Sequence, residues 1–80
     1  MTFQEAKDRI ASLDPLDFNR PDSLTRRGDT MIARRAFSWD QPRHAIIFHW
    51  RANIKELFPE ATIIKADVDG KNNARCWIQF

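Results

Sequence analysis

The sequence has little of what marks secreted, membrane or disulfide-stabilised proteins. Its single cysteine, Cys76, can form no internal disulfide bond. Its longest apolar run, Ala45 to Phe48, is far shorter than the roughly 20 residues that cross a bilayer. Its first residues carry neither the basic start nor the apolar stretch of a signal peptide. We therefore expect a cytoplasmic protein with no membrane partner.

Glycine is also scarce, with two in 80 residues, and repeats and low-complexity segments are absent. A chain of this length has room for one core, so residues 1–80 are predicted to form a single domain. The net charge of +2 is unevenly spread. Residues 1–19 sum to −2 and residues 20–51 to +4, since seven arginines face three aspartates there. This asymmetry permits an anionic partner without requiring one.

A short helix is predicted at the N-terminus. Thr2 and Glu5 have the spacing of a capping box, and the apolar positions that follow recur every three or four residues: Phe3, Ala6, Ile10 and Leu13. The helix should stop at Asp14-Pro15, because proline disfavours helical geometry in the residue before it. Residues 14–28 are predicted to form a long loop, with at most one helical turn after Pro21. It is either a contact element or a connector held down by Leu16, Phe18 and Leu24.

Residues 30–39 are interpreted as a strand with Met31, Ala33, Phe37 and Trp39 on one side, although a helix remains an alternative. The second helix is clearer. Asp40 is its expected cap, Pro42 suits its first turn, and Pro59 ends it. One face of this helix is apolar and predicted to meet the core: Ile46, Ile47, Trp50, Ile54, Leu57 and Phe58.

The last two predicted elements are strands 61–68 and 74–80. A two-residue Asp69-Gly70 turn would place their apolar sets on different faces. A loop of three or five residues avoids this. The three-residue loop would set Lys65 beside Arg75, whereas the five-residue loop 69–73 sets Asp67 there, so the opposite charges favour the longer loop. The longer loop also brings the apolar residues to one face: Ile64, Ala66, Val68, Ala74, Cys76, Ile78 and Phe80.

The predicted fold is therefore a small α+β domain of order α-β-α-β-β. It has a three-stranded sheet, with a parallel right-handed crossover from the first strand to the second and a C-terminal antiparallel hairpin. Both helices are expected to pack on one face of the sheet.

Catalytic and metal-binding patterns are not found in the sequence. His44 and His49 point about 140° apart on a helix, the segment Asp67–Gly70 lacks the later ligands of a calcium loop, and Cys76 is expected to be a core thiol. We therefore expect no enzyme activity, no cofactor and no metal.

Two aromatic residues are the best candidates for binding. Phe48 points away from the predicted core and is surrounded by one histidine and two cations: His44, Arg51 and Lys55. Trp77 lies on the sheet face opposite Cys76, near Ile63, Lys65 and Arg75. The alternative is that other segments cover both rings. Arginines on either side of Gly28 could contact phosphates or form a solvated surface: Arg26, Arg27 and Arg34.

These features predict a small non-catalytic module that binds another protein or a nucleoprotein complex. An adaptor or stoichiometric inhibitor fits, as in phage or mobile-element antagonists of host defence of the anti-CRISPR kind. The alternative is a nucleic-acid-binding protein that uses the central arginines and exposed aromatics. A homodimer joined through Trp77 is compatible with either.

Overall fold

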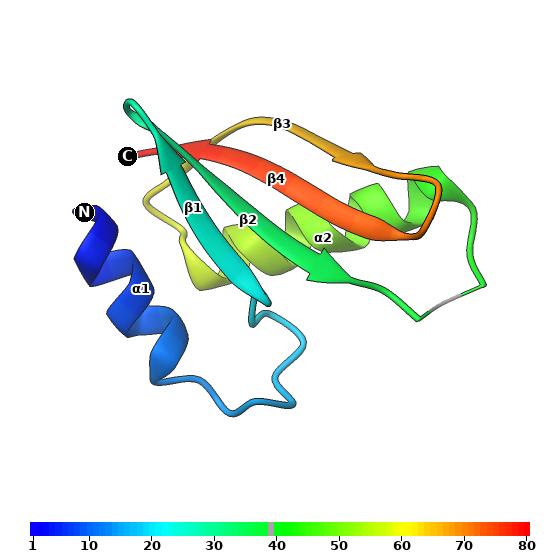
Figure 1. Cartoon of the computed structure of the whole chain (residues 1–80), viewed down its shortest axis with the longest axis horizontal. Helices are drawn as coiled ribbons and strands as arrows, with labels where there is room; N and C mark the ends of the chain where they lie inside the picture. Colours follow the sequence, from blue (N-terminus) through cyan, green and yellow to red (C-terminus); the bar gives the residue numbers. More distant parts are fainter. Residues whose placement is uncertain (39) are drawn as a thin grey trace.

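A computed structural model describes residues 1–38 and 40–80. In this part of the chain there are two helices and four strands, and each helix is followed by two strands (Figure 1). The strands form one antiparallel sheet in the order β1-β2-β4-β3. The elements, in chain order, are α1 (Phe3–Ala11), β1 (Ser23–Arg27), β2 (Thr30–Ala36), α2 (Arg43–Leu57), β3 (Thr62–Val68) and β4 (Asn73–Gln79). The α+β class is confirmed, but the sheet has four strands where the sequence predicted three.

The additional strand, β1, lies in the segment predicted to be loop. It pairs with β2 through a two-residue Gly28-Asp29 turn, in which Gly28 has a φ of 61°. Glycine adopts this left-handed geometry without steric cost, and glycine at the first turn position joins two antiparallel strands tightly. The expected helical turn after Pro21 is therefore wrong, and the loop ends where β1 begins.

The crossover through α2 differs from the prediction. The strands β2 and β3 point in the same direction, but β4 lies between them and pairs antiparallel with both (Figure 1). The chain leaves β2, crosses behind the sheet as α2, and returns to the far edge as β3. The final hairpin then inserts β4 into the gap, so that no two strands of the sheet are parallel neighbours.

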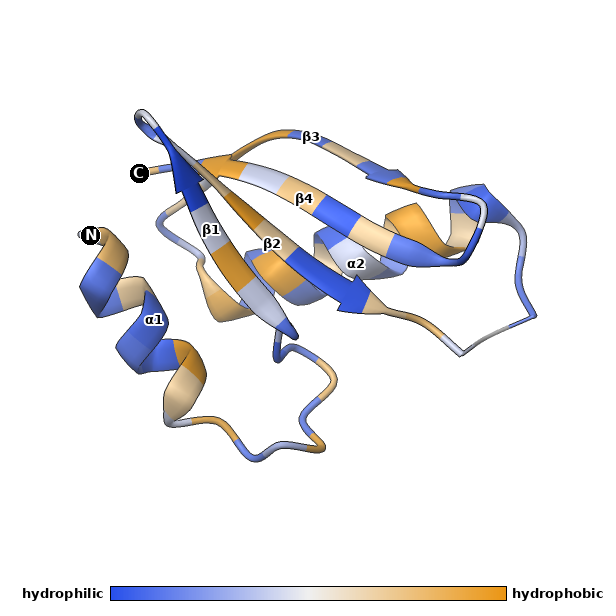
Figure 2. Ribbon diagram, viewed as in Figure 1, coloured by the Kyte–Doolittle hydropathy of each residue, from blue (hydrophilic) through white to orange (hydrophobic). Residues whose placement is uncertain are grey.

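The β3–β4 hairpin has the predicted five-residue loop and register, with Asp67 opposite Arg75 and Val68 opposite Ala74. Strand β4 alternates between hydrophobic and hydrophilic residues as a half-buried strand should (Figure 2). One expectation is wrong: a register shift between Ile63 and Lys65 places Ile63, not Ile64, opposite Ile78. Ile64 is consequently 49% exposed instead of packed inward.

Helix α1 begins at the predicted capping box. The Thr2 hydroxyl accepts from the Glu5 N–H, and the Thr2 N–H donates to the Glu5 carboxylate, which lowers the pKa of Glu5. Arg9 fixes the helix to the rest of the molecule. Its guanidinium binds both Glu60 carboxylate oxygens and the Leu57 carbonyl, at 2.6 to 3.1 Å.

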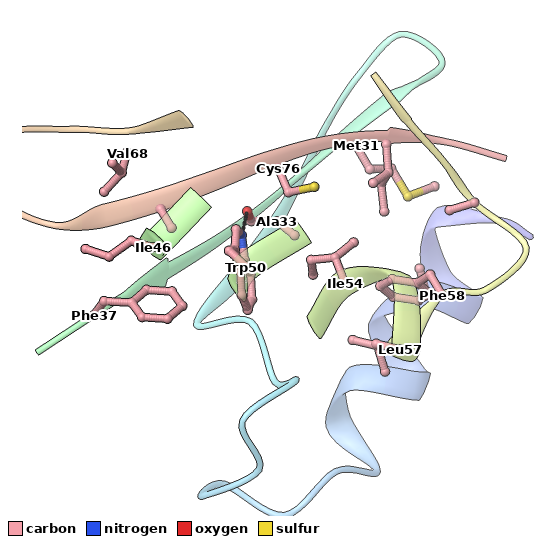
Figure 3. Close-up of a cluster of buried hydrophobic side chains, with 14 residues drawn as sticks. Met31, Ala33, Phe37, Ile46, Trp50, Ile54, Leu57, Phe58, Val68 and Cys76 are labelled. Carbon is pink, nitrogen blue, oxygen red and sulfur yellow. Dashed lines mark hydrogen bonds between the residues drawn. The ribbon is translucent and has the colours of Figure 1, made fainter. Parts of the chain in front are cut away.

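Helix α2 starts one residue after its N-cap, Pro42, and no side chain caps it, so the expected Asp40 cap is wrong. Its predicted core face is confirmed. Trp50 is fully buried, donates from Nε1 to the Ala33 carbonyl at 3.2 Å, and meets Phe37 edge to face (Figure 3). Ile47 is half-buried, and the other residues of this face are buried: Ile46, Ile54, Leu57 and Phe58.

Both helices pack on the same face of the sheet, as predicted. From the strands, that face contributes the buried residues Met31, Ala33, Val68, Ala74, Cys76 and Ile78. From α1 it receives Ala6, with Phe3 and Ile10 packed around it. Residues 30–36 are a strand, which settles the strand-or-helix alternative there, while the expected inward position of Trp39 falls outside the described residues.

Candidate interaction surfaces

One side of α2 carries the most exposed aromatic ring of the structured elements. Phe48 is 69% exposed, as the helical phase predicted, and its ring meets His49 edge to face at 5.8 Å. Beside it runs a groove between α2 and the start of β3. The residues along this groove are Phe48, Arg51, Ala52, Lys55, Ala61, Thr62 and Ile63, and we call them the α2 surface.

The α2 surface is positively charged. Lys55 lies at its end and is held in place, because Nζ donates to the carbonyls of Pro59 and Ala61 at 3.1 and 2.8 Å. Arg51 is exposed at its centre. The described residues of the groove include no carboxylate. His44 is also exposed on α2, one turn before Phe48. Apolar contact and positive charge therefore coincide here.

The opposite flank of α2 borders the loop that follows α1. Leu16 and Phe18 are 86% and 72% exposed, so they do not hold the loop down; Leu24 alone packs against the core. Pro21, which is fully buried, and polar contacts hold it instead. Arg35 donates to the carbonyls of Asp17 and Arg20, and Asn53 donates to the carbonyl of Phe18 at 3.0 Å. The loop is thus ordered with two apolar side chains presented outward.

The second candidate surface is the sheet face that points away from both helices, which we call the open face. Trp77 lies near its middle, directly opposite Ile32 on β2 and Lys65 on β3. Lys65 Nζ is 4.2 Å from the centroid of the Trp77 ring, and the Arg75 guanidinium is 5.0 Å from it. Trp77 is half-buried. Lys65 and Arg75 lie against its ring, as the sequence predicted. Ile63 is not among its neighbours, because the bulge turns Ile63 inward.

Two arginines face each other across the open face. Arg34 is directly opposite Arg75 in the β2–β4 register. Arg75 forms two hydrogen bonds with the Asp67 carboxylate, at 2.8 and 2.7 Å, which raise the pKa of its guanidinium. Arg34 has only a neutral partner, the Thr25 hydroxyl at 2.6 Å. The carboxylates of Asp22 and Asp69 line the same hollow as the two arginines, so acidic groups balance the positive charge of the pair.

The remaining predicted arginines divide between the two faces. Arg27 shares the face of Thr25, whereas Arg26 turns to the helix side and lies over the Phe3 ring at 5.6 Å. Arg26, Arg27 and Arg34 therefore do not form one patch. Arg35 also turns to the helix side, opposite to Arg34, and reaches past the core edge to the carbonyls of Asp17 and Arg20.

The described side chains that could act as nucleophiles or metal ligands do not lie together at one site. Cys76 is fully buried, and burial raises the pKa of its thiol to about 11. Over residues 1–38 and 40–80, no three His, Cys, Asp or Glu side chains come close enough to hold a metal ion. In the same residues, no helix has the length and apolar character needed to cross a membrane.

No match was found. Neither protein-family models nor curated proteins nor solved structures resemble the chain significantly. Sequence reasoning missed Leu16 and Phe18 as outward-facing residues and Ile32 as the neighbour of Trp77. The assignment of Ile32 required the β2–β4 register, which no local pattern contains.

Proposed function

We propose that the chain is a small non-catalytic module that binds another protein, or the protein part of a nucleoprotein complex, through the α2 surface. The observation that carries this proposal is the exposure of Phe48 beside a groove that combines apolar walls with the cations Arg51 and Lys55. The module acts as a stoichiometric inhibitor or an adaptor, the mode of action expected of an anti-CRISPR-like antagonist, and needs no catalytic group.

Hydrophobic burial supplies the affinity in this proposal. Covering a phenylalanine side chain completely gives about 1.5 to 3 kcal/mol, and Phe48 has most of that still to gain because 69% of it is exposed. Aromatic anchors next to a pocket often dominate the energy of protein interfaces. Ala52 and Ile63 form the adjacent wall of the groove, so that a partner side chain can insert beside the ring.

Charge defines the partner. Arg51 and Lys55 lie along a groove without carboxylates, and Arg43 and His44 begin the same helix. A partner that presents an apolar side chain flanked by Asp or Glu is complementary in both respects. A basic partner would instead bring like charges together in an interface from which water is removed, and this would cost several kcal/mol of binding free energy.

The test compares two exposed apolar residues. Wild-type protein, Phe48→Ala and Leu16→Ala are used for affinity capture from the cells that make the protein, with nuclease present. The captured partner is then purified and titrated calorimetrically. Phe48→Ala should weaken binding at least tenfold, whereas Leu16→Ala should stay within twofold, because Leu16 is 86% exposed but lies outside the α2 surface.

Circular dichroism and thermal melting check that both variants are folded. The proposal is refuted if the purified partner binds both variants as tightly as wild type, or if the two substitutions weaken binding equally. Self-association also contradicts it: sedimentation velocity that shows a dimer disrupted by Phe48→Ala would assign the α2 surface to a second copy of the chain.

A further inference from the structure

The outer edge of β3 borders the α2 surface and has no neighbouring strand in the described structure, because the sheet order places β3 at one end. The groove of the α2 surface has α2 on one side and Ala61, Thr62 and Ile63, where the chain enters β3, on the other. We propose that the protein partner binds as an extended acidic segment that adds a fifth strand to this edge. This mode of binding rests on the function proposed above for the same surface.

The backbone of Ala66 points to the free edge. In the β3–β4 hairpin, the Asp69 N–H donates to the Asn73 carbonyl at 3.1 Å. Pairs of residues that exchange hydrogen bonds recur at every second position of an antiparallel ladder. Asp67 and Lys65 therefore direct their N–H and C=O groups to β4, whereas Ala66 between them directs its own groups outward. Outward backbone groups of an edge strand are a template for another strand.

Arg43 confirms this direction and closes the far end of the edge. Its guanidinium donates to the Val68 carbonyl, which lies two residues after Ala66 and therefore also points away from β4. Val68 is 1% exposed, whereas Ile64 is 49% exposed. The accessible part of the edge thus begins at Thr62, beside the groove, and ends near half-buried Ala66.

The groove supplies what the backbone alone does not. Lysines and bulges in an edge strand disfavour pairing with an arbitrary strand, and β3 has both, at Lys65 and Ile64. The side chains of an added strand would alternate between the two faces of the sheet. Those on the helix side would enter the groove beside Phe48 and Ala52, so that backbone hydrogen bonds provide affinity and the groove provides selection.

Charge selects an acidic segment. The charged residues of the groove are Arg51 and Lys55, and Arg51 forms no salt bridge within the described residues. The acidic residues nearest to the groove in the chain are engaged or turned away: Glu56 borders the opposite flank of α2, Glu60 binds Arg9, and Asp67 binds Arg75. Asp or Glu side chains in the added strand would therefore meet cations without a competing carboxylate.

A second copy of the chain is a poorer occupant of the same edge. Antiparallel pairing of two β3 edges would extend one sheet into the other and place both α2 helices on the same side of it. The two cationic grooves would then share one seam, where like charges repel each other.

The experiment uses two synthetic eight-residue peptides, acetyl-EVDVEVDV-amide and acetyl-KVRVKVRV-amide, each titrated into the ¹⁵N-labelled full chain. At saturation the acidic peptide should shift the amide resonances of Ile63 and Ala66 and slow hydrogen exchange of the Ala66 amide at least tenfold, because that amide gains an acceptor. The Arg26 amide on β1, the other edge strand, should exchange at an unchanged rate. The basic peptide should bind at least tenfold more weakly.

Two substitutions at one residue test the backbone contact. Ala66→Pro removes the outward N–H and leaves the ladder to β4 intact, since proline is tolerated in an edge strand where its missing N–H would face solvent. Ala66→Gly keeps the N–H. Ala66→Pro should weaken binding of the acidic peptide at least tenfold, and Ala66→Gly less than threefold. Circular dichroism checks that both variants are folded, and if Ala66→Pro is not, exchange of the Ala66 amide in wild type decides.

Strand addition is overturned if the acidic peptide does not bind, if the basic peptide binds as tightly, or if the acidic peptide binds while the Ala66 amide exchanges as fast as in the free chain. These outcomes leave the α2 surface itself untouched, since its test is the loss of the captured partner in Phe48→Ala. Wild-type affinity of that partner for Ala66→Pro, together with its loss in Phe48→Ala, would retain the α2 surface and exclude strand addition.

Discussion

The thiol of Cys76 is enclosed between the sheet and α2, and its ionisation is coupled to folding. Burial raises the pKa of the thiol from 9.0 to about 11, because a thiolate is poorly solvated there. In the unfolded chain the thiol regains its ordinary pKa and loses its proton first as the pH rises. The unfolded state is thereby stabilised, so the free energy of unfolding should fall between about pH 9 and pH 11 and be constant, as far as Cys76 is concerned, below pH 8.

The magnitude follows from these two pKa values. At pH 10 the expected loss is about 1.4 kcal/mol, and above pH 11 it approaches about 2.7 kcal/mol. The measurement is urea unfolding of wild type and Cys76→Ala at pH 7 and pH 10, since lysines and other groups change stability over this range in both proteins. The difference in stability between the two proteins should move by about 1.4 kcal/mol in favour of Cys76→Ala.

An equal loss for the two proteins would refute the reasoning and show that Cys76 ionises freely in the folded state. A thiol with a pKa of about 11 is almost entirely protonated at neutral pH, and only the thiolate is a strong nucleophile.

Three further predictions concern the fold. Gly28→Ala should lower the free energy of unfolding in urea by about 1 to 2 kcal/mol, because Gly28 has a φ of 61°. Gly70→Ala should be neutral, and an added methyl group meets no atom within 4 Å at either site, so the difference reports the backbone geometry alone. Equal costs would contradict the turn geometry. Trp50→Phe should lower the free energy of unfolding by about 2 to 3 kcal/mol, because it removes ring volume from the core and the hydrogen bond to the Ala33 carbonyl. Phe48→Ala should change it by less than about 0.5 kcal/mol, and a larger effect would show that the Phe48 ring is covered. Deleting Ile64 should leave the midpoint of thermal unfolding nearly unchanged, because it removes the bulge and keeps every other pair. Deleting Ala66 should lower that midpoint, because it turns Lys65 to the helix side opposite Cys76. Equal midpoints would place the register shift elsewhere.

The sequence predicted well the elements whose geometry is decided locally. The periodicity of α2 identified both its buried face and the outward direction of Phe48, because a helix fixes the angle between successive side chains. The two-residue turn of the last hairpin was excluded by the faces of the apolar residues, and the opposite charges of Asp67 and Arg75 then selected the correct register from the remaining two. In both cases the information lies within a few residues or within a single hairpin.

Other features depend on contacts distant in sequence. Strand β1 was missed because Leu24 is its one apolar residue, as expected for an edge strand, although Gly28-Asp29 between two extended segments was a usable hairpin signal. The insertion of β4 between β2 and β3 has no local signal. The bulge was hidden because Ile63 and Ile64 are both apolar, so either could have been the inward residue.

The two candidate surfaces, the α2 surface and the open face, are separated by the sheet itself. Phe48 extends from α2, which packs on one face through Trp50 and Ile54, whereas Lys65 and Trp77 lie on the other face. A macromolecule on the open face would therefore not contact Phe48, and a partner on the α2 surface would leave the sheet cations accessible. They meet only at the start of β3, where Ile63 turns toward the groove and Lys65 toward the open face. In a regular strand, residues two apart share one face; the bulge at Ile64 instead places Ile63 and Lys65 on opposite faces.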